Sequence, residues 1–202
     1  MIKLYDTDIS GSCYKIRLLL NMLGQQYETI PVDFVNKEHK SPGMTALNAF
    51  GEIPIFEDGL LRLRDAQAIM VYLAKRYDSS NQWYPDGAAA QGKIQQWLST
   101  GGGEVMNAAG ARLVKVLNYP MDLAKLQAGA HRVFKIMDDH LADRAFLELD
   151  HPTIGDIACF PYTALAGEGG IDLSAYPNVL AWIDRIKRLP GFITMPGIAA
   201  AQ

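Results

Sequence analysis

One short stretch, Gly-Glu-Ile-Pro-Ile at residues 51–55, constrains the fold of this 202-residue chain more than any other. A residue before proline is driven into an extended conformation, and proline is confined to the first residue or the edge of a strand because it cannot donate to a sheet ladder. Ile53 is therefore expected to keep its backbone N–H and C=O free at a sheet edge, where an extended peptide can pair with it. Taken alone, the stretch also fits a proline that merely opens a strand.

The residues before this stretch predict a strand, a helix and a second strand. The strands are expected over residues 2–5 and 27–32. Between them, apolar residues recur at i, i+3, i+4 and i+7, the stripe of an amphipathic helix: Ile16, Leu19, Leu20 and Leu23. Gly24 follows as a helix stop. This βαβ order predicts two strands of one sheet joined by a right-handed crossover.

The following residues predict a short helix, a hairpin and a longer helix. The short helix is expected over residues 41–48, and strands over 55–57 and 60–63 flank Asp58-Gly59. Asp-Gly between apolar runs is the strongest short signal for a β-hairpin. The helix after the hairpin has a core-facing stripe: Ala66, Ile69, Met70, Leu73 and Tyr77. The predicted fold class of this part is therefore α/β, a small mixed sheet with helices packed on it.

The composition changes at residues 79–87, where Ser, Asn, Pro, Asp and Gly indicate a loop. We therefore expect a domain over residues 1–78, a linker over 79–87 and an all-helical domain over 88–202. No strand pattern is evident after the linker. Two helical repeats are found there instead: Leu126, Ala130, Val133, Met137 and Leu141, and then Val179, Trp182, Ile183 and Ile186.

Charge and composition argue against several classes of function. The formal charge is −3 at pH 7 and no long Lys/Arg run is present, which disfavours a nucleic-acid-binding surface. No apolar run approaches the roughly 18–20 residues that span a bilayer, and no signal-peptide pattern follows Met1. Cys13, Cys159 and the histidines show no metal-ligand spacing. We therefore expect a cytoplasmic protein with no metal, membrane or nucleic-acid partner.

Three motifs, taken in order, resemble those of the soluble glutathione transferases over nearly the whole chain. They are residues 4–5 with 10–15, residues 51–54 with 64–69, and residues 153–156. The third has a physical account, because Thr153 can cap a helix that has Asp156 at position N3. The resemblance, strongest to bacterial theta-, nu- and beta-like members, implies a thioredoxin-like N-terminal domain of order βαβαββα followed by an all-α domain. It also implies a cis Ile53–Pro54 bond and a homodimer.

The resemblance implies an enzyme that adds the thiolate of glutathione, its co-substrate, to a small electrophile in detoxification. Lowering a thiol pKa from about 8.5 to about 6.5 requires roughly 2.7 kcal/mol, and one hydrogen bond to a charged group contributes roughly 1.5–3 kcal/mol. One hydroxyl at the start of the first helix therefore suffices. Ser10 is the first candidate and Ser12 the second, although serine is also a common helix cap. Cys13 is expected to be a small buried filler, and Tyr5 a core residue.

The resemblance also assigns residues to the rest of glutathione: Ile53, Pro54, Asp65, Ala66, His39 and Lys40. Ile53 would pair its backbone with the cysteinyl part. Asp65 would face the γ-glutamyl amino group, and the N–H of Ala66 the γ-glutamyl carboxylate at a helix N-terminus. His39 and Lys40 would meet the glycyl carboxylate. Asp65 is equally compatible with a plain helix cap, and the His-Lys pair with a solvated loop.

Two positions depart from the family's pattern. Ala66 stands where the family usually has a serine, whose hydroxyl binds the γ-glutamyl carboxylate, and Glu52 brings a like charge towards an anionic peptide. Both departures predict weaker glutathione binding than is usual in the family, or a different ligand. The glycine run at residues 101–103 is a further oddity, because each Gly in a helix costs about 1 kcal/mol relative to Ala. It indicates a bulge or kink, a close approach of helices or a simple break between two helices.

The pocket for the electrophile is expected from residues near the first helix and in the helical domain: Ile9, Met106, Ala109, Leu113 and Tyr162. Apolar residues at these positions fit a core equally well. Two other functions are compatible with the motifs. One is a nu-like glutathione-dependent disulfide reductase, and the other is a non-catalytic binding or interaction module with the same fold. The sequence does not identify the electrophile.

Overall fold

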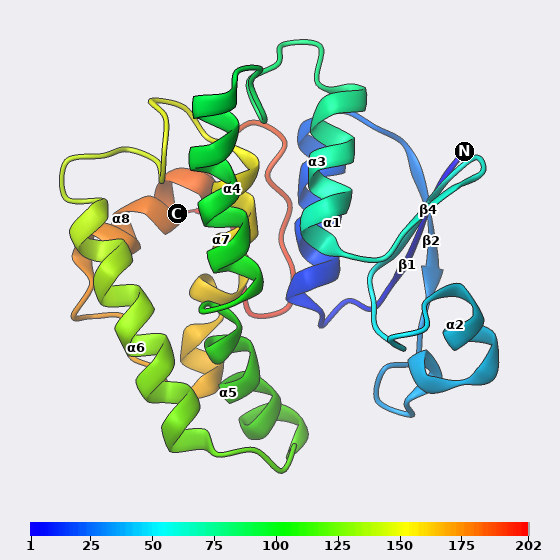
Figure 1. The fold of residues 1–202 in the computed structure, drawn as a ribbon. Coiled ribbons are helices and arrows are strands. Elements are labelled where there is room, and N and C mark those ends of the chain that lie inside the picture. The colour runs from blue at the N-terminus through cyan, green and yellow to red at the C-terminus, as the bar shows by residue number, and fades with distance from the viewer. Residues whose placement is uncertain (202) are drawn as a thin grey trace.

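The N-terminal part of the protein is built on a mixed β-sheet. The computed structural model describes residues 1–201, and within them the sheet has four strands in the order β2-β1-β3-β4 (Figure 1). The strands are β1 (Ile2–Asp6), β2 (Tyr27–Pro31), β3 (Ile55–Asp58) and β4 (Leu61–Leu63). β1 pairs in parallel with β2 and antiparallel with β3, and β4 pairs antiparallel with β3. The predicted mixed sheet is confirmed.

Helices cover both faces of this sheet (Figure 1). α1 (Gly11–Met22) and α3 (Ala66–Tyr77) lie on the face that carries the main core. On the other face, α2 (Pro42–Leu47) follows the short 3₁₀ helix η1 (Glu38–Lys40) and contributes to a smaller cluster. Gly24, with φ of +65°, follows Leu23, the C-terminal cap of α1, as the sequence predicts.

The hairpin between β3 and β4 is shifted by one residue from its predicted position. Asp58 is paired within the sheet, so the two loop residues are Gly59 and Leu60 rather than Asp58 and Gly59. The Asp58 carboxylate accepts hydrogen bonds from the hydroxyls of Tyr72 (2.8 Å) and Tyr77 in α3. These contacts accompany the pairing of Asp58 with Leu61, and they come from a helix that follows the hairpin.

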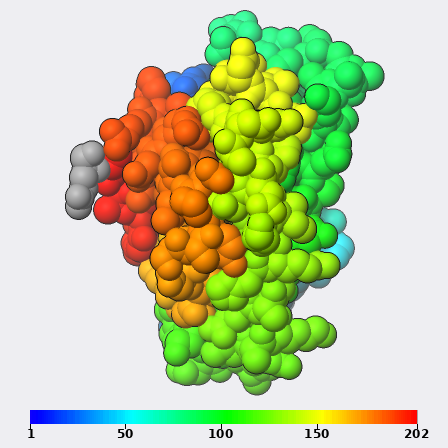
Figure 2. All heavy atoms as spheres, turned by 90° about the vertical axis from the view of Figure 1, so that its left-hand side faces the viewer, coloured from blue at the N-terminus to red at the C-terminus, as the bar shows by residue number. Residues whose placement is uncertain are grey.

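The remainder of the described chain is helical, as predicted. It forms α4 (Ala88–Gly102), α5 (Met106–Leu117), α6 (Leu123–His140), α7 (Ile154–Ala164), the 3₁₀ helix η2 (Ala166–Gly169) and α8 (Pro177–Lys187). α7 is central, because its residues from Ile154 to Thr163 are all buried and it contacts α1, α3, α4 and α5. Figure 2 shows α6 and α8 side by side on an outer face of this part.

α7 begins with the predicted capping box. The Thr153 hydroxyl accepts from the N–H of Gly155 at 3.2 Å, and the Asp156 carboxylate accepts from the N–H of Thr153 at 2.9 Å. The same carboxylate also accepts from the N–H of Leu147 and from Nε1 of Trp182, both at 2.9 Å. A buried carboxylate requires several such donors, so Asp156 joins three segments of the helical part and has a structural role.

The glycine run marks both the end of α4 and a close approach of two helices. α4 ends at Gly102, and Gly103 is its C-terminal cap. A Cβ on Gly101 would lie only 2.7 Å from the carbonyl oxygen of Ala158 in α7. α4 and α7 can therefore contact each other at this separation only because residue 101 has no side chain.

Candidate active site

A cleft of about 330 Å³ lies between the start of α1, the loops that follow β2 and α2, and the helices α5 and α7. Its lining contains ten of the predicted site residues: Ile9, Ser10, Ser12, His39, Lys40, Ile53, Met106, Ala109, Leu113 and Tyr162. It adds seven that were not predicted as site residues: Thr7, Phe34, Gly51, Glu52, Arg112, Leu117 and Tyr119. Pro54, Asp65 and Ala66 are not part of the lining. The structure thus brings together polar residues from the N-terminal part and apolar residues from α5.

Ser10 is the N-terminal cap of α1 and also lines the cleft. Its Oγ accepts a hydrogen bond from the backbone N–H of Cys13 at 3.2 Å. A hydroxyl accepts through its lone pairs and donates through its hydrogen, and within residues 1–201 the only side-chain acceptor beside the Ser10 hydroxyl is the weakly accepting sulfur of Cys13. Helix capping and donation into the cleft are therefore compatible roles for the same hydroxyl.

Ser12 lies one position into the helix from Gly11, and its polar atoms face Tyr162 of α7. The Tyr162 hydroxyl oxygen lies 3.1 Å from the backbone N of Ser12 and 3.2 Å from its Oγ. The N–H of Ser12 can only donate, so Tyr162 accepts at least one hydrogen bond there. Ser12 is consequently engaged by a residue 150 positions away, whereas Ser10 makes its hydrogen bonds only with residues three or four positions away along the chain.

Cys13 is fully buried, as expected of a small core residue. Burial raises the pKa of its thiol to about 12, and the nearby Asp6 carboxylate adds to the effect. A thiol that stays protonated is a poor nucleophile. Tyr5 is only partly buried, beside the small cluster formed by Val32, Met44 and Ile55.

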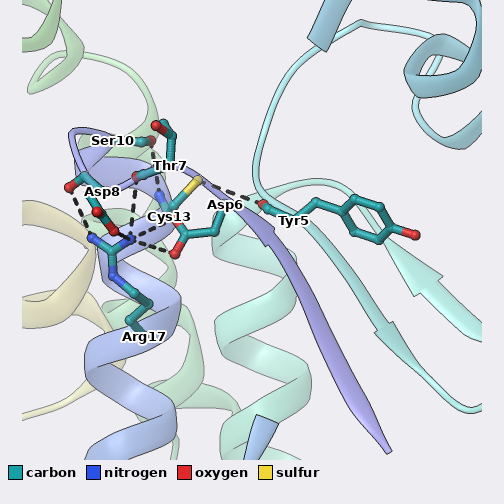
Figure 3. A network of polar contacts seen from close by, with 7 residues as sticks. All are labelled: Tyr5, Asp6, Thr7, Asp8, Ser10, Cys13 and Arg17. Atoms are coloured by element: carbon teal, nitrogen blue, oxygen red, sulfur yellow. Dashed lines mark hydrogen bonds and ion pairs between the residues drawn. The ribbon is translucent and has the colours of Figure 1, made fainter. Parts of the chain in front are cut away.

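Arg17, a residue of α1, binds the loop that carries Ser10 (Figure 3). Arg17 Nη1 lies 2.5 and 2.7 Å from the two carboxylate oxygens of Asp6, which is 2% exposed. The same guanidinium donates to the carbonyl oxygens of Thr7 at 3.3 Å and Asp8 at 3.2 Å. Because several hydrogen bonds accompany this buried ion pair, the loop and the cap at its end have a defined conformation.

Arg112 of α5 donates a hydrogen bond to the same loop, at the carbonyl that follows that of Asp8. Its Nη1 donates to the carbonyl oxygen of Ile9 at 2.8 Å, and its Nε donates to the Glu168 carboxylate at 2.5 Å. Arg112 is nearly buried and lines the cleft. Sequence reasoning missed it, and the available signal was a lone arginine three residues after Ala109 in an apolar helix.

His39 is buried, so it is not the solvated loop residue that the sequence also allowed. It is 4% exposed, and its ring is stacked on Phe34 with ring centres 4.3 Å apart. Burial, assisted by Lys40, lowers its pKa, so the ring is neutral at pH 7. Its buried Nδ1 has no hydrogen-bond partner within residues 1–201. Lys40 is exposed, and its Nζ donates to the carbonyl of Phe50 at 3.2 Å.

Ile53 lies beside the cleft with an unpaired backbone. Its N–H and C=O make no hydrogen bond to another group within residues 1–201, and the Ile53–Pro54 bond is cis, as predicted. Asp65 caps α3, because its carboxylate accepts from the N–H of Ala68 at 2.9 Å. Ala66 is the first residue of that helix and is 6% exposed.

Two kinds of site are not found in the described chain. Among residues 1–201, His, Cys, Asp and Glu side chains form no group of three or more that could hold a metal ion. No helix in the same range combines the length and apolar character needed to cross a membrane.

Two family profiles match the chain in the order of its two parts. The profile described as "Glutathione S-transferase, N-terminal domain" matches residues 4–81. The profile described as "Glutathione S-transferase, C-terminal domain" matches residues 120–185. The first match contains the sheet except for the first two residues of β1, together with all of α1, and the second contains the capping box of α7.

Similar proteins agree with these matches. Glutathione S-transferase 3 of Zea mays is 30% identical, over 95% of this chain and 91% of its own. A glutathione S-transferase structure from Pseudomonas fluorescens has a TM-score of 0.90 at 30% identity, over 96% of this chain and 98% of that one. A glutathione transferase homologue from Lodderomyces elongisporus, solved with two GSH per subunit, has a TM-score of 0.86 at 26% identity, over 94% of each chain. The chain therefore belongs to the glutathione S-transferase family, and it is a glutathione transferase that uses glutathione as its co-substrate.

Proposed function

We propose that the enzyme conjugates glutathione to a small electrophile and that Ser10 stabilises the reacting thiolate. The observation that carries this proposal is the Ser10 hydroxyl, which lines the cleft at the N-terminus of α1 and has no acceptor stronger than the Cys13 sulfur for its hydrogen. One hydrogen bond to a charged group contributes roughly 1.5–3 kcal/mol, and a helix N-terminus adds about 0.3–2 kcal/mol. Their sum covers the roughly 2.7 kcal/mol needed to lower the thiol pKa by two units.

The rest of glutathione is proposed to extend from the cleft towards the start of α3. The unpaired backbone of Ile53 supports pairing with the cysteinyl part, and the buried, unpartnered Nδ1 of His39 supports contact with the glycyl carboxylate. Asp65 and the N–H of Ala66 lie at the helix N-terminus where the γ-glutamyl end is proposed to bind. Lys40 supplies a nearby positive charge.

The electrophile is proposed to bind against the apolar wall of the cleft. Ile9, Met106, Ala109 and Leu113 supply that wall. Glutathione-dependent disulfide reduction is the rival reaction. No observation favours it, and the buried Cys13, with its raised pKa, offers no reactive thiol. Conjugation of a chlorinated nitrobenzene and reduction of hydroxyethyl disulfide, measured side by side, distinguish the two reactions.

We also propose a cytoplasmic homodimer. Two-fold symmetry is the commonest form of soluble oligomers, and Phe50 (59% exposed) and Leu60 (106% exposed) supply apolar surface outside the cleft. Cys13 and Cys159 are both buried free thiols, which fits a reducing compartment. Light scattering at micromolar concentration should give twice the chain mass, and a clean monomer would contradict the dimer.

Replacement of Ser10 tests the catalytic proposal. In Ser10→Ala the pKa of bound glutathione, followed by thiolate absorbance in the ultraviolet, should rise by about one to two pH units, and turnover should fall while glutathione affinity is nearly unchanged. Ser41→Ala is the matched control, because Ser41 caps α2 in the same way, accepting from Met44 at 3.3 Å, and lies outside the cleft. A shift in Ser12→Ala but not in Ser10→Ala would reverse the assignment. An ordinary thiol pKa in the wild-type complex would contradict the proposed mechanism altogether.

A further inference from the structure

Tyr162 reaches from the helical part of the chain to the first turn of α1. Its hydroxyl lies 3.1 Å from the backbone N and 3.2 Å from the Oγ of Ser12. The side chain also lines the cleft that contains Ser10. Tyr162 therefore contributes a polar group beside the proposed thiolate site, although it comes from a different part of the fold.

Gly11 makes room for this contact. A Cβ on Gly11 would lie 2.7 Å from Cε1 and 2.9 Å from Cζ of the Tyr162 ring. Real Cβ atoms do not approach a ring so closely, so the ring rests directly on the bare backbone of α1. The Tyr162 ring can therefore reach the start of α1 only because residue 11 has no side chain.

The hydrogens at this contact can be counted. Ser12 and Tyr162 bring three: one backbone N–H and two hydroxyl hydrogens. The N–H of Ser12 donates to Tyr162, and one hydroxyl donates to the other. One hydroxyl hydrogen is left over whichever hydroxyl is the donor, and within residues 1–201 it has no other acceptor. Because both residues line the cleft, that hydrogen is available to a bound ligand.

Lys15 lies against the ring of Tyr162. Its Nζ lies over the Tyr162 ring, 5.5 Å from the ring centre, and Lys15 is fully buried. A cation on the face of an aromatic ring is attracted to its π electrons, so this contact favours the observed position of the Tyr162 ring. Burial raises the pKa of Tyr162, which keeps the hydroxyl protonated at neutral pH.

We propose that Ser12 and Tyr162 act as one interchangeable pair that supplies a second hydrogen bond to the sulfur of bound glutathione. The inference rests on the proposed function, in which Ser10 supplies the first hydrogen bond. It makes the helical part of the chain a contributor to thiolate activation as well as to the electrophile pocket. Loss of one member of the pair leaves the other hydroxyl hydrogen free, so only loss of both removes the donor.

A double-mutant cycle tests the pair. Ser12→Ala and Tyr162→Phe should each raise the pKa of bound glutathione by no more than about half a pH unit, the loss expected when one hydrogen bond of a mutually polarised pair is removed. The double variant should raise it by about one to two pH units, the value of a whole hydrogen bond to a charged group. At pH 6, where the bound thiol is mostly protonated in both forms, KM for glutathione should stay within about twofold while kcat falls.

Two further variants separate this role from a structural one. Tyr14→Phe is the matched control, because the Tyr14 hydroxyl donates to the carbonyl of Ile193 at 2.5 Å and Tyr14 lies outside the cleft; it should leave the thiol pKa unchanged. The second variant combines Ser12→Thr with Tyr162→Phe and so keeps one hydroxyl of the pair. The thiol pKa of bound glutathione should then lie close to that of the single variants. This variant still tests the pair if the combination of Ser12→Ala with Tyr162→Phe folds poorly.

The possible outcomes are distinct. The pair is overturned if the double variant raises the thiol pKa by no more than the sum of the two single shifts, or does not raise it. It is also overturned if either single variant alone raises the thiol pKa by about one to two pH units. If in the same experiment the wild-type thiol pKa is low and rises in Ser10→Ala, the proposed function stands and only the pair is wrong. If the wild-type complex has an ordinary thiol pKa, the proposed function itself has failed.

Discussion

The ammonium group of Lys15 in α1 donates a hydrogen bond to the carbonyl oxygen of Gly101, close to the C-terminal end of α4, over 3.3 Å. Lys15 has no exposed surface and no carboxylate partner within residues 1–201. The negative end of the α4 dipole offsets part of the cost of burying the charge. Desolvation still dominates and lowers the pKa of Lys15 to about 8, although the nearby Cys159 and Asp65 act in the opposite direction.

This burial predicts a pH dependence of stability. The pKa of Lys15 is about 8 in the folded protein and 10.5 in an unfolded chain, so between pH 8 and pH 10 the unfolded chain retains the proton and the folded protein releases it. Stability should therefore rise with pH over this window. Compared with Lys15→Met, wild-type stability should increase by about 2 kcal/mol between pH 7 and pH 10 in urea unfolding.

Lys135→Met provides the control for that experiment. Lys135 is exposed on α6, and its hydrogen bond to Asp139 raises its pKa, so it titrates above the window. Its pH profile should run parallel to that of the wild type. If the profile of Lys15→Met also runs parallel to that of the wild type, folding does not lower the pKa of Lys15.

Gly101→Ala should destabilise the protein by about 1–3 kcal/mol, the range for overpacking a close contact. The reason is that the added Cβ would lie 2.7 Å from the carbonyl oxygen of Ala158. Gly92→Ala in the same helix meets nothing within 4 Å, so it should stabilise by about 0.5–1 kcal/mol through helix propensity. Thermal unfolding of both variants measures the difference, and equal effects would contradict the close approach of α4 and α7.

Asp156→Asn should cost about 3 kcal/mol, because the amide group brings donors to a position where Thr153, Leu147 and Trp182 already donate. Asp122→Asn is the matched control. Asp122 caps α6 at an exposed position, accepting from Lys125 at 3.0 Å, and Asn caps helices about as well as Asp, so its effect should lie within about 0.5 kcal/mol. Similar losses in the two variants would show that Asp156 does no more than cap its helix.

Ala66→Ser should tighten glutathione binding by about tenfold, since a hydrogen bond to a carboxylate contributes roughly 1.5 kcal/mol or more. Isothermal titration of glutathione into both forms measures the change. Ala68→Ser, two positions later on the exposed side of α3, should leave the affinity unaltered. Unchanged or weaker binding in Ala66→Ser would place the γ-glutamyl group elsewhere.

The secondary structure was predictable because its signals are local. The stripe of α1, the stop at Gly24 and the capping box of Thr153 and Asp156 each involve residues within a few positions of one another, and each is confirmed. The hairpin was the exception. Gly59, with φ of +62°, takes the first loop position, and Asp58 stays in the strand, where it accepts hydrogen bonds from tyrosines of α3 that lie 14 and 19 positions later.

The sequence by itself determined the order of the elements, the family and most of the residues that line the cleft, because periodicity, turn chemistry and motif spacing are properties of short segments. Only the tertiary structure decided which partner each of these residues meets. The contact of Ser12 with Tyr162 joins positions 150 apart, and that of Arg112 with Ile9 joins positions 103 apart. Such contacts depend on how α5 and α7 pack against α1, and packing is set by the shapes of all the buried side chains together.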